Sequence, residues 1–170
     1  RIVATGSLAG NVLKYIAVES EGSGSEFNSV ISQLTNLAAG KGIFHLFVFT
    51  KAKYSKSFQY IGFKELAKSD NAALLESGDY LIGDYLAELP RVANQEEKKI
   101  AGIVMNANPF TKGHRYLVEK AASENDYVYV FVVSTDASLF NSKERLQLVK
   151  EGTADLKNVF VVSGGDYMVS

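Results

Sequence analysis

The alternation of apolar and amphipathic runs after residue 99 is the feature that most restricts the fold of this chain. Three continuous apolar runs predict strands, at 100–105, 127–134 and 158–163. Two runs between them have the apolar spacing of helices, at 113–123 and 142–151. Strands separated by crossover helices form parallel β-α-β units. Residues 99–170 are therefore expected to form a parallel α/β domain.

The first part of the chain has a different element order. A turn signal at 9–11 separates two β-rich runs and predicts a hairpin, and apolar residues at helical spacing over 27–38 predict a helix. The run 43–50 is apolar on both faces and predicts a buried central strand. We expect a mixed α/β domain over 1–72, followed by a polar connecting segment over 73–98.

Composition excludes several classes of function. A hydrophobic fraction of 46% is ordinary for a globular protein, and a net charge of −1 does not supply the basic surface that nucleic acids or anionic membranes attract. The absence of cysteine removes thiolate chemistry and disulfides, and two histidines are too few for a histidine-rich metal site. No apolar run approaches the length of a membrane span. We expect a cytoplasmic protein without a nucleic-acid partner, a membrane segment or a bound metal of its own.

The loop after the first of these parallel strands carries the candidate chemistry. It contains amides, a hydroxyl, a glycine and a histidine within the run Asn106, Ala107, Asn108, Pro109, Phe110, Thr111, Lys112, Gly113 and His114. Ligands of parallel α/β sheets bind beyond the carboxyl ends of the strands, where a helix N-terminus attracts phosphate. Gly113 would let a phosphate approach closely, and Thr111 and His114 could donate to its oxygens. The simpler alternative makes Thr111 a helix cap and His114 an ordinary residue of the first turn.

The spacing Thr-x-Gly-His at residues 111–114 resembles the signature of the nucleotidylyltransferase superfamily, which cleaves ATP between its α and β phosphates. The resemblance implies a Rossmann-like fold for this domain. The longer segments 104–119, 140–146 and 152–159 are similar to the citrate lyase ligase family, also called acetate:citrate lyase ligase. No Walker-type glycine-rich loop is present, so a P-loop kinase or ATPase is excluded.

The citrate lyase ligase resemblance implies an enzyme that uses ATP and acetate to form acetyl adenylate. The acetyl group would then pass to the thiol of a dephospho-coenzyme-A-derived prosthetic group on the acyl carrier subunit of citrate lyase. It implies that Thr111 and His114 are catalytic, and that ATP is bound by Asn106, Asn108, Phe110, Thr111, Gly113 and His114. Mg²⁺ is expected to arrive with ATP. Lys112 and Arg145 are candidate phosphate contacts, although neighbouring charges also suit a solvated helix face around Arg145.

The N-terminal part resembles the Gcn5-related N-acetyltransferases in two places. One is the turn Gly22-Ser23-Gly24 before the first helix, and the other is the segment 60–64. The resemblance implies a partial acetyltransferase-like domain in which Gly22 and Gly24 contact the diphosphate of the prosthetic group. Glu19 departs from the family pattern, because a carboxylate repels phosphate at a position where glutamine or arginine is usual. His45 is expected to be a core or sheet-end histidine.

The second motif of the superfamily, Ile-Ser-Ser-Thr followed by a basic residue, does not occur before Ser170. We therefore expect the nucleotidylyltransferase-like domain to be truncated at its C-terminus and the chain to be an incomplete piece of the enzyme. Two alternatives stay open. One is a coenzyme-A-dependent acetyltransferase with a nucleotide-binding appendage, and the other is a noncatalytic carrier-binding module.

Overall fold

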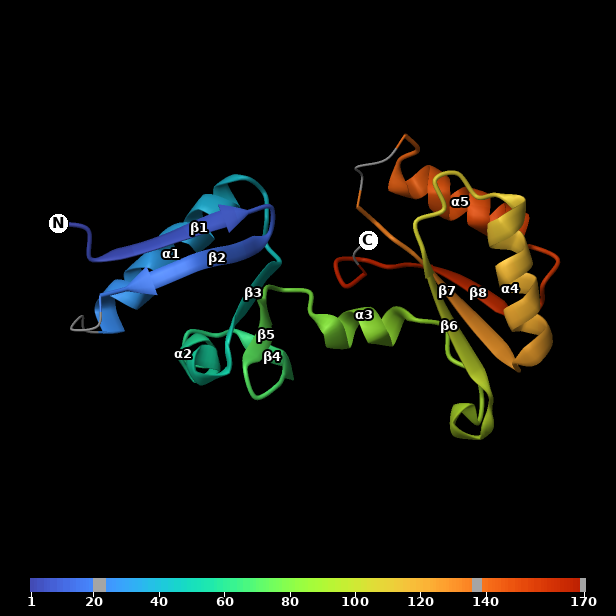
Figure 1. Cartoon of the computed structure of the whole chain (residues 1–170), viewed down its shortest axis with the longest axis horizontal. Helices are drawn as coiled ribbons and strands as arrows, with labels where there is room; N and C mark the ends of the chain where they lie inside the picture. Colours follow the sequence, from blue (N-terminus) through green and yellow to red (C-terminus); the bar gives the residue numbers. More distant parts are fainter. Residues whose placement is uncertain (20–23, 136–138, 169–170) are drawn as a thin grey trace. The chain divides into compact units, whose positions relative to one another are not determined.

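The computed structural model describes residues 1–19, 24–135 and 139–168. The chain divides into two compact units, Arg1–Asp84 and Tyr85–Ser170, which are described separately. Both are α/β, so the expected fold class is confirmed: a mixed sheet comes first and a parallel sheet with crossover helices follows (Figure 1).

The first unit is built on a five-stranded sheet with the order β1-β2-β3-β5-β4. Its strands are β1 Ala4–Ala9, β2 Val12–Val18, β3 Leu46–Lys51, β4 Lys64–Lys68 and β5 Ala72–Ser77. The expected hairpin is present as β1 and β2, and its turn uses Gly10 at a φ of 59°. Helix α1, Gly24–Gly40, is the crossover that makes β2 and β3 parallel neighbours.

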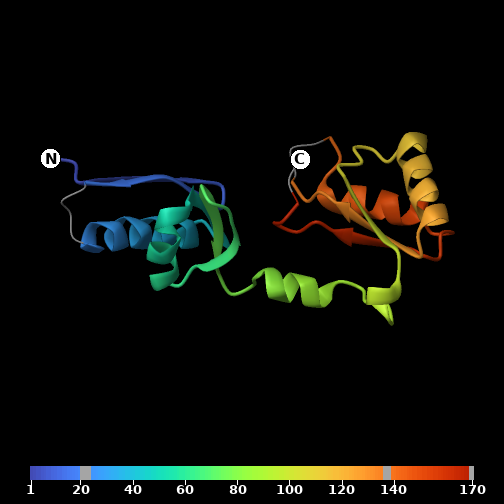
Figure 2. The ribbon, with the colours of Figure 1, turned by 60° about the horizontal axis from the view of Figure 1, so that its bottom comes forward.

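Two helices cover one face of this sheet (Figure 2). The buried face of α1 follows the predicted spacing through Ile31, Leu34 and Ala38. The second helix, α2 Ser55–Tyr60, follows the short turn η1 Ala52–Tyr54 and inserts Phe58 into the same core. Burial of these apolar side chains fixes which face of the sheet is inside.

The boundary expected at residue 72 is too early. Residues 72–77 form β5, which pairs with both β3 and β4 inside the first sheet. The pattern is hard to read because Glu76, a residue normally found at the surface, is fully buried in this strand. The short helix α3, Ile82–Glu88, follows, and the division between the units falls within it. The segment 73–98 is therefore not a simple connector.

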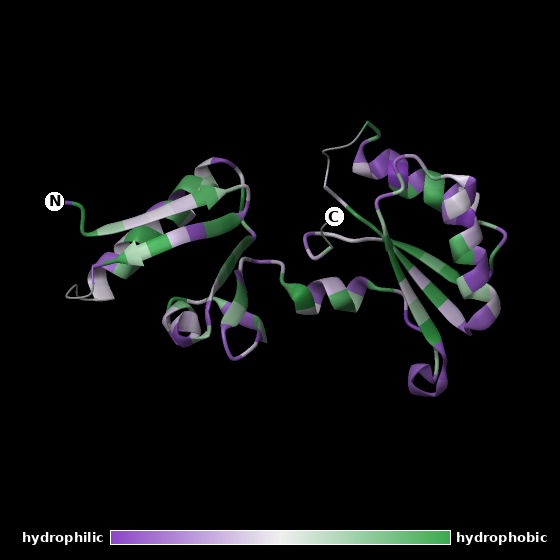
Figure 3. Cartoon of the chain, viewed as in Figure 1, coloured by the Kyte–Doolittle hydropathy of each residue, from purple (hydrophilic) through white to green (hydrophobic). Residues whose placement is uncertain are grey.

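The second unit contains the predicted parallel sheet, with the order β6-β7-β8. Its elements after the turn η2 Gln95–Glu97 are β6 Ile100–Met105, α4 Lys112–Glu124, β7 Tyr127–Val132, α5 Ser142–Gly152 and β8 Val159–Ser163. Each lies within a few residues of its expected range. The strands are predominantly apolar and the helices carry polar residues on one side (Figure 3).

Alternate residues of these strands face opposite sides of the sheet. Val128, Val130 and Val132 of β7 pack with Val118 of α4 and Val149 of α5. Both helices therefore cover the same face, as right-handed crossovers between strands in sequential order require. The three strands run parallel, so the loops that follow them leave from one edge.

Candidate nucleotide-binding site

The loop from Asn106 to Thr111 joins the carboxyl end of β6 to the start of α4, as expected. Ala107 is buried and has a left-handed φ of 49°, and the Asn108–Pro109 peptide bond is cis. A left-handed alanine costs about 1–2 kcal/mol, so surrounding contacts must hold this conformation. The conformation of this loop is therefore fixed by its contacts.

Thr111 and His114 contact each other at the N-terminus of α4. The Thr111 backbone N–H donates to His114 Nδ1 over 3.1 Å, and the Thr111 hydroxyl lies 2.8 Å from the same nitrogen. An amide N–H can only donate, so Nδ1 accepts and the neutral imidazole carries its proton on Nε2. The histidine is therefore prepared to donate one hydrogen bond, from Nε2.

The two readings of these residues, helix capping and phosphate binding, turn out to be compatible. Thr111 has the extended backbone of an N-cap, and His114 is the third residue of the helix. The same contact that caps the helix fixes the ring of His114. Phe110 adds a second constraint, because its ring stacks on the imidazole with centroids 5.8 Å apart and planes 22° from parallel.

Gly113 and Lys112 occupy the exposed first turn of α4. A Cβ at Gly113 would stand 3.7 Å from Thr111 Oγ1, so glycine leaves the space beside that hydroxyl open. Lys112 forms no ion pair with any residue that the structure describes. The positive end of the helix dipole and a free lysine both favour an anion here.

Arg145 is not the surface residue that the sequence suggested. Its side chain in α5 is fully buried, so its role as a phosphate contact and its place on a solvated helix face are both wrong. Arg145 Nη1 donates to the Asn106 carbonyl over 2.8 Å, to Asn106 Oδ1 over 2.6 Å and to the Val133 carbonyl over 2.8 Å. Nη2 and Nε donate to the carbonyls of Thr135 and Phe140, over 2.8 and 3.0 Å.

These bonds make Arg145 a bridge between the loops that follow β6 and β7. Asn106 is engaged by the guanidinium through both of its oxygens. Asn108 extends the bridge, because its Oδ1 accepts from the Phe140 N–H over 3.1 Å. Both asparagines thus have a structural role that the sequence did not reveal. Burial is tolerated because the charged guanidinium donates to several oxygens.

Arg115 is a second residue that sequence reasoning missed. It donates to Asp155 through Nη1 and Nη2, over 2.6 and 2.7 Å, and to the Gly152 carbonyl over 2.6 Å. The Arg115 guanidinium lowers the pKa of Asp155 to about 2. The first turn of α4 is thereby tied to the end of α5. The only sequence signal was the position of Arg115 directly after His114.

The first unit contains a cavity of about 480 Å³ where β2 and β3 separate. Only Val12 and Leu13 of β2 pair with β3, and the cavity is lined by the diverging strands together with Phe27, Tyr54 and Phe58. Its volume is typical of small-molecule sites. Gly24 is exposed at the first residue of α1, whereas Gly22 lies outside the described residues. Glu19 forms an ion pair with Arg1.

His45 has a structural role, as expected. His45 Nε2 lies 2.9 Å from Glu76 Oε2, and Glu76 Oε1 accepts from the Ile82 N–H over 2.9 Å. Glu76 belongs to strand β5 of the first unit and is fully buried there.

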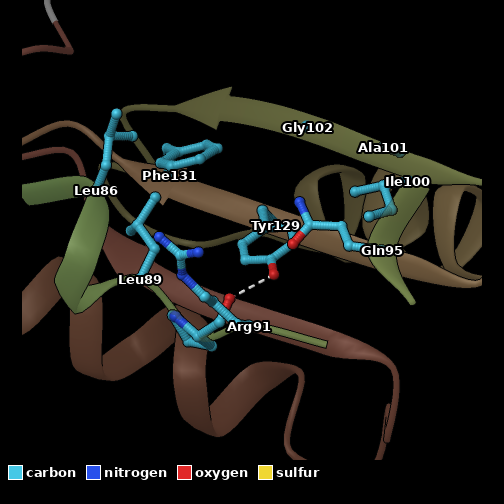
Figure 4. Close-up of a pocket in the computed structure, with 10 residues that line it drawn as sticks. Leu86, Leu89, Arg91, Gln95, Ile100, Ala101, Gly102, Tyr129 and Phe131 are labelled. Carbon is cyan, nitrogen blue, oxygen red and sulfur yellow. Dashed lines mark hydrogen bonds between the residues drawn. The ribbon is translucent and has the colours of Figure 1, made fainter. Parts of the chain in front are cut away.

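The second unit also has an apolar pocket of about 430 Å³ whose lining does not include the loop from Asn106 to Thr111. Figure 4 shows it between Leu86 and Leu89 and the sheet residues Tyr129 and Phe131, with the Tyr129 hydroxyl bonded to the Pro90 carbonyl. Tyr129 and Phe131 alternate with the residues that pack on α4 and α5, so this pocket is on the opposite face of the sheet.

Two kinds of feature are absent from the described residues. No group of three or more His, Asp or Glu side chains is placed to hold a metal ion. No described helix combines the length and apolar character needed to cross a bilayer.

One family recurs among the known proteins that this chain resembles. The family model "Citrate lyase ligase C-terminal domain" matches residues 100–170. Over its full length the chain is 36% identical to a citrate (pro-3S)-lyase ligase of Escherichia coli (strain K12) and covers 49% of it. The corresponding values are 39% and 50% for the ligase of Klebsiella pneumoniae, and 36% and 51% for that of Haemophilus influenzae.

The chain therefore spans about half the length of the curated relatives it matches. The alignments nevertheless include all of this chain, its N-terminal unit as well as the region matched by the family model. The resemblance that the loop suggested is confirmed: this chain is similar along its whole length to citrate lyase ligases, and its residues 100–170 match the model of the citrate lyase ligase C-terminal domain.

Proposed function

We propose that this chain is the nucleotide-binding part of an ATP-dependent ligase that acts on citrate lyase. In the first step an acetate oxygen attacks the α-phosphorus of ATP, the bond to the bridging oxygen breaks, and pyrophosphate leaves. In the second step the thiol of the carrier's prosthetic group, after losing its proton, attacks the acetyl carbon and AMP leaves. The relatives are named citrate (pro-3S)-lyase ligase, which supports the ligase class and the citrate lyase partner.

The observation that carries the proposal is the arrangement of Thr111 and His114 at the start of α4. The Thr111 N–H holds His114 Nδ1, so Nε2–H is the group left to donate to an α-phosphate oxygen. Acetate is already an anionic nucleophile, so the first step needs no general base. We infer that catalysis here consists of positioning and charge stabilisation, with Lys112 and the open space at Gly113 next to the phosphates. Mg²⁺ would enter as part of the ATP substrate.

The cavity of the first unit supports a role for that unit in holding the prosthetic group. A cavity of about 480 Å³ between separating strands, with α1 starting at Gly24, suits a slender arm that ends in a diphosphate. Replacing Gly24 with Glu adds a negative charge at the start of α1. We expect a raised apparent KM for the carrier protein and no change in the adenylation of acetate. An unchanged KM would refute this part of the proposal.

The adenylation step is tested by acetate-dependent exchange of pyrophosphate into ATP, measured on the full-length protein. His114→Asn and Thr111→Ala are each expected to slow exchange about 10²–10³-fold, the usual effect of losing one transition-state donor. Lys120→Met, at the far end of the same helix, is the control and should leave exchange unchanged. Exchange that persists in both loop variants would contradict the site.

Two further outcomes decide between classes of protein. Exchange that does not depend on acetate would contradict acetate as the substrate. Acetyl transfer from acetyl-coenzyme A without ATP would instead support an acetyltransferase with a nucleotide-binding appendage. Absence of both activities, with carrier binding retained, would support a noncatalytic module.

A further inference from the structure

The ring of Phe110 packs against both His114 and Gly152. One side of the ring stacks on the imidazole, with centroids 5.8 Å apart. The ring also lies very close to the Gly152 backbone. A Cβ built at position 152 would stand 2.5 Å from Phe110 Cε1 and 2.6 Å from Phe110 Cδ1. Carbon atoms in contact are separated by about 3.5–4.0 Å. No residue with a side chain fits at position 152 while Phe110 keeps its place.

The backbone at Gly152 does not itself require glycine. It is the last residue of α5 and is not among the described residues with positive φ. Glycine in a helix is less stable than alanine, because it loses more conformational freedom on folding. The absence of a side chain at this position is therefore explained by the Phe110 ring.

The end of α5 cannot easily move away to relieve such a clash. The Gly152 carbonyl accepts from Arg115 Nη1 over 2.6 Å, and Arg115 also binds Asp155. Thr153 is buried and donates to the Val149 carbonyl over 2.8 Å. Because Arg115 directly follows His114, these bonds fix the end of α5 against the same helical turn that presents the histidine.

We propose that Gly152 is a positioning residue for His114, which it holds in the orientation set by the Thr111 N–H by leaving room for the Phe110 ring that stacks on the imidazole. The structural part of the proposal rests on these contacts alone. Its catalytic consequence rests on the proposed function. The Phe110 ring would be the part displaced by a methyl group at position 152, since the backbone at Gly152 is held.

The first experiment is Gly152→Ala in the 170-residue chain, read by the ¹⁵N resonances of the histidine side chains. The chain has two histidines, so His114→Asn identifies the signal of His114. We expect the wild-type ring to carry its proton on Nε2 and the variant to show a mixture of the two neutral tautomers, because Nδ1 no longer meets the Thr111 N–H. Gly40→Ala is the matched control: it is also the last residue of a helix, and a Cβ there meets nothing within 4 Å.

The second experiment removes the Phe110 ring, through which Gly152 is proposed to act on His114. Phe110→Leu alone should shift the tautomer mixture in the same direction as Gly152→Ala. In the Phe110→Leu background, adding Gly152→Ala should cause little further change, since the ring that it displaces is gone. Phe110→Leu also keeps the proposal testable if Gly152→Ala fails to fold. A His114 signal that stays at its wild-type position in Phe110→Leu would overturn the proposal.

The third measurement is acetate-dependent pyrophosphate exchange by the full-length protein. Misplacing a catalytic group by about 1 Å can slow a reaction about 100-fold, so we expect Gly152→Ala to lower the rate constant about 10–100-fold with a smaller change in KM for ATP. If the wild type catalyses pyrophosphate exchange, and Gly152→Ala shows the same tautomer and the same rate, the positioning role alone is refuted. A shifted tautomer without any wild-type exchange would refute the adenylation function and leave the positioning role standing.

Discussion

Replacing Arg145 with Met should remove a large part of the stability of the second unit. The guanidinium is fully buried and donates to oxygens of Asn106, Val133, Thr135 and Phe140. Met keeps most of the aliphatic volume, so the change removes the donors without opening a large cavity.

The magnitude follows from the surroundings of each acceptor. The bond to the Val133 carbonyl is fully buried, and an orphaned buried carbonyl costs about 1–3 kcal/mol. The other acceptors are partly buried and can recover some hydration, so each loses about 0.5–1 kcal/mol. We expect a total loss of about 3–7 kcal/mol. That is a large share of the roughly 5–15 kcal/mol that stabilises an ordinary domain.

Native-state hydrogen exchange followed by mass spectrometry is the suitable assay, because it reports on each unit separately. A loss of 1.4 kcal/mol corresponds to a factor of about ten. The slowest amides of β6 and β7 should therefore exchange about two to five orders of magnitude faster, while peptides of the first unit keep their rates.

Lys143→Met is the matched control, since Lys143 is exposed in the same helix two positions earlier. It should change stability by less than about 0.5 kcal/mol. A loss below about 1 kcal/mol in Arg145→Met would refute the reasoning, because it would mean that the buried guanidinium does not hold the two loops together. Equal loss in both units would do the same.

Two further predictions concern the Arg115–Asp155 ion pair and the contact between His45 and Glu76. The Arg115 guanidinium holds the pKa of Asp155 at about 2, below its ordinary 3.8, so the pair stabilises the fold above about pH 4 and this contribution is lost as the pH falls towards 2. The difference in urea midpoint between wild type and Asp155→Asn should be constant from pH 5 to 7 and fall to a small fraction of that value at pH 2. An undiminished difference at pH 2 would contradict the prediction. In the first unit, His45→Leu leaves the buried Glu76 carboxylate without its imidazole partner and should cost about 2–4 kcal/mol. Hydrogen exchange should show this loss in the first unit only, and adding Glu76→Leu should restore part of it.

The elements with strong periodicity were predictable from the sequence. The apolar spacing in α1 and the continuous apolar strands β6, β7 and β8 are dictated by burial on one face or on both. Strand β5 was missed because Glu76 occupies a core position there. A buried carboxylate is stable only with partners, and those partners, His45 and the Ile82 N–H, come from other segments.

The candidate site shows the same division. Thr111 and His114 lie three residues apart, so a helix that starts between them brings the N-cap and the imidazole together by local geometry alone. Gly152 and Arg145 could not be assigned in this way. The residues next to Gly152 in the sequence do not predict its contact with the Phe110 ring, and those next to Arg145 do not predict its bond to the Asn106 carbonyl.

The sequence by itself determined the parallel sheet, the helix that begins after Thr111 and the family of the loop, because each depends on residues close together along the chain. Only the tertiary structure decided that a charged residue of α5 is the buried bridge between two loops, and that a glycine at the end of that helix supports the ring behind His114. The physical reason is that hydrogen-bond satisfaction and close packing depend on which distant segments meet, and these meet only when α4 and α5 pack on the same face of the sheet.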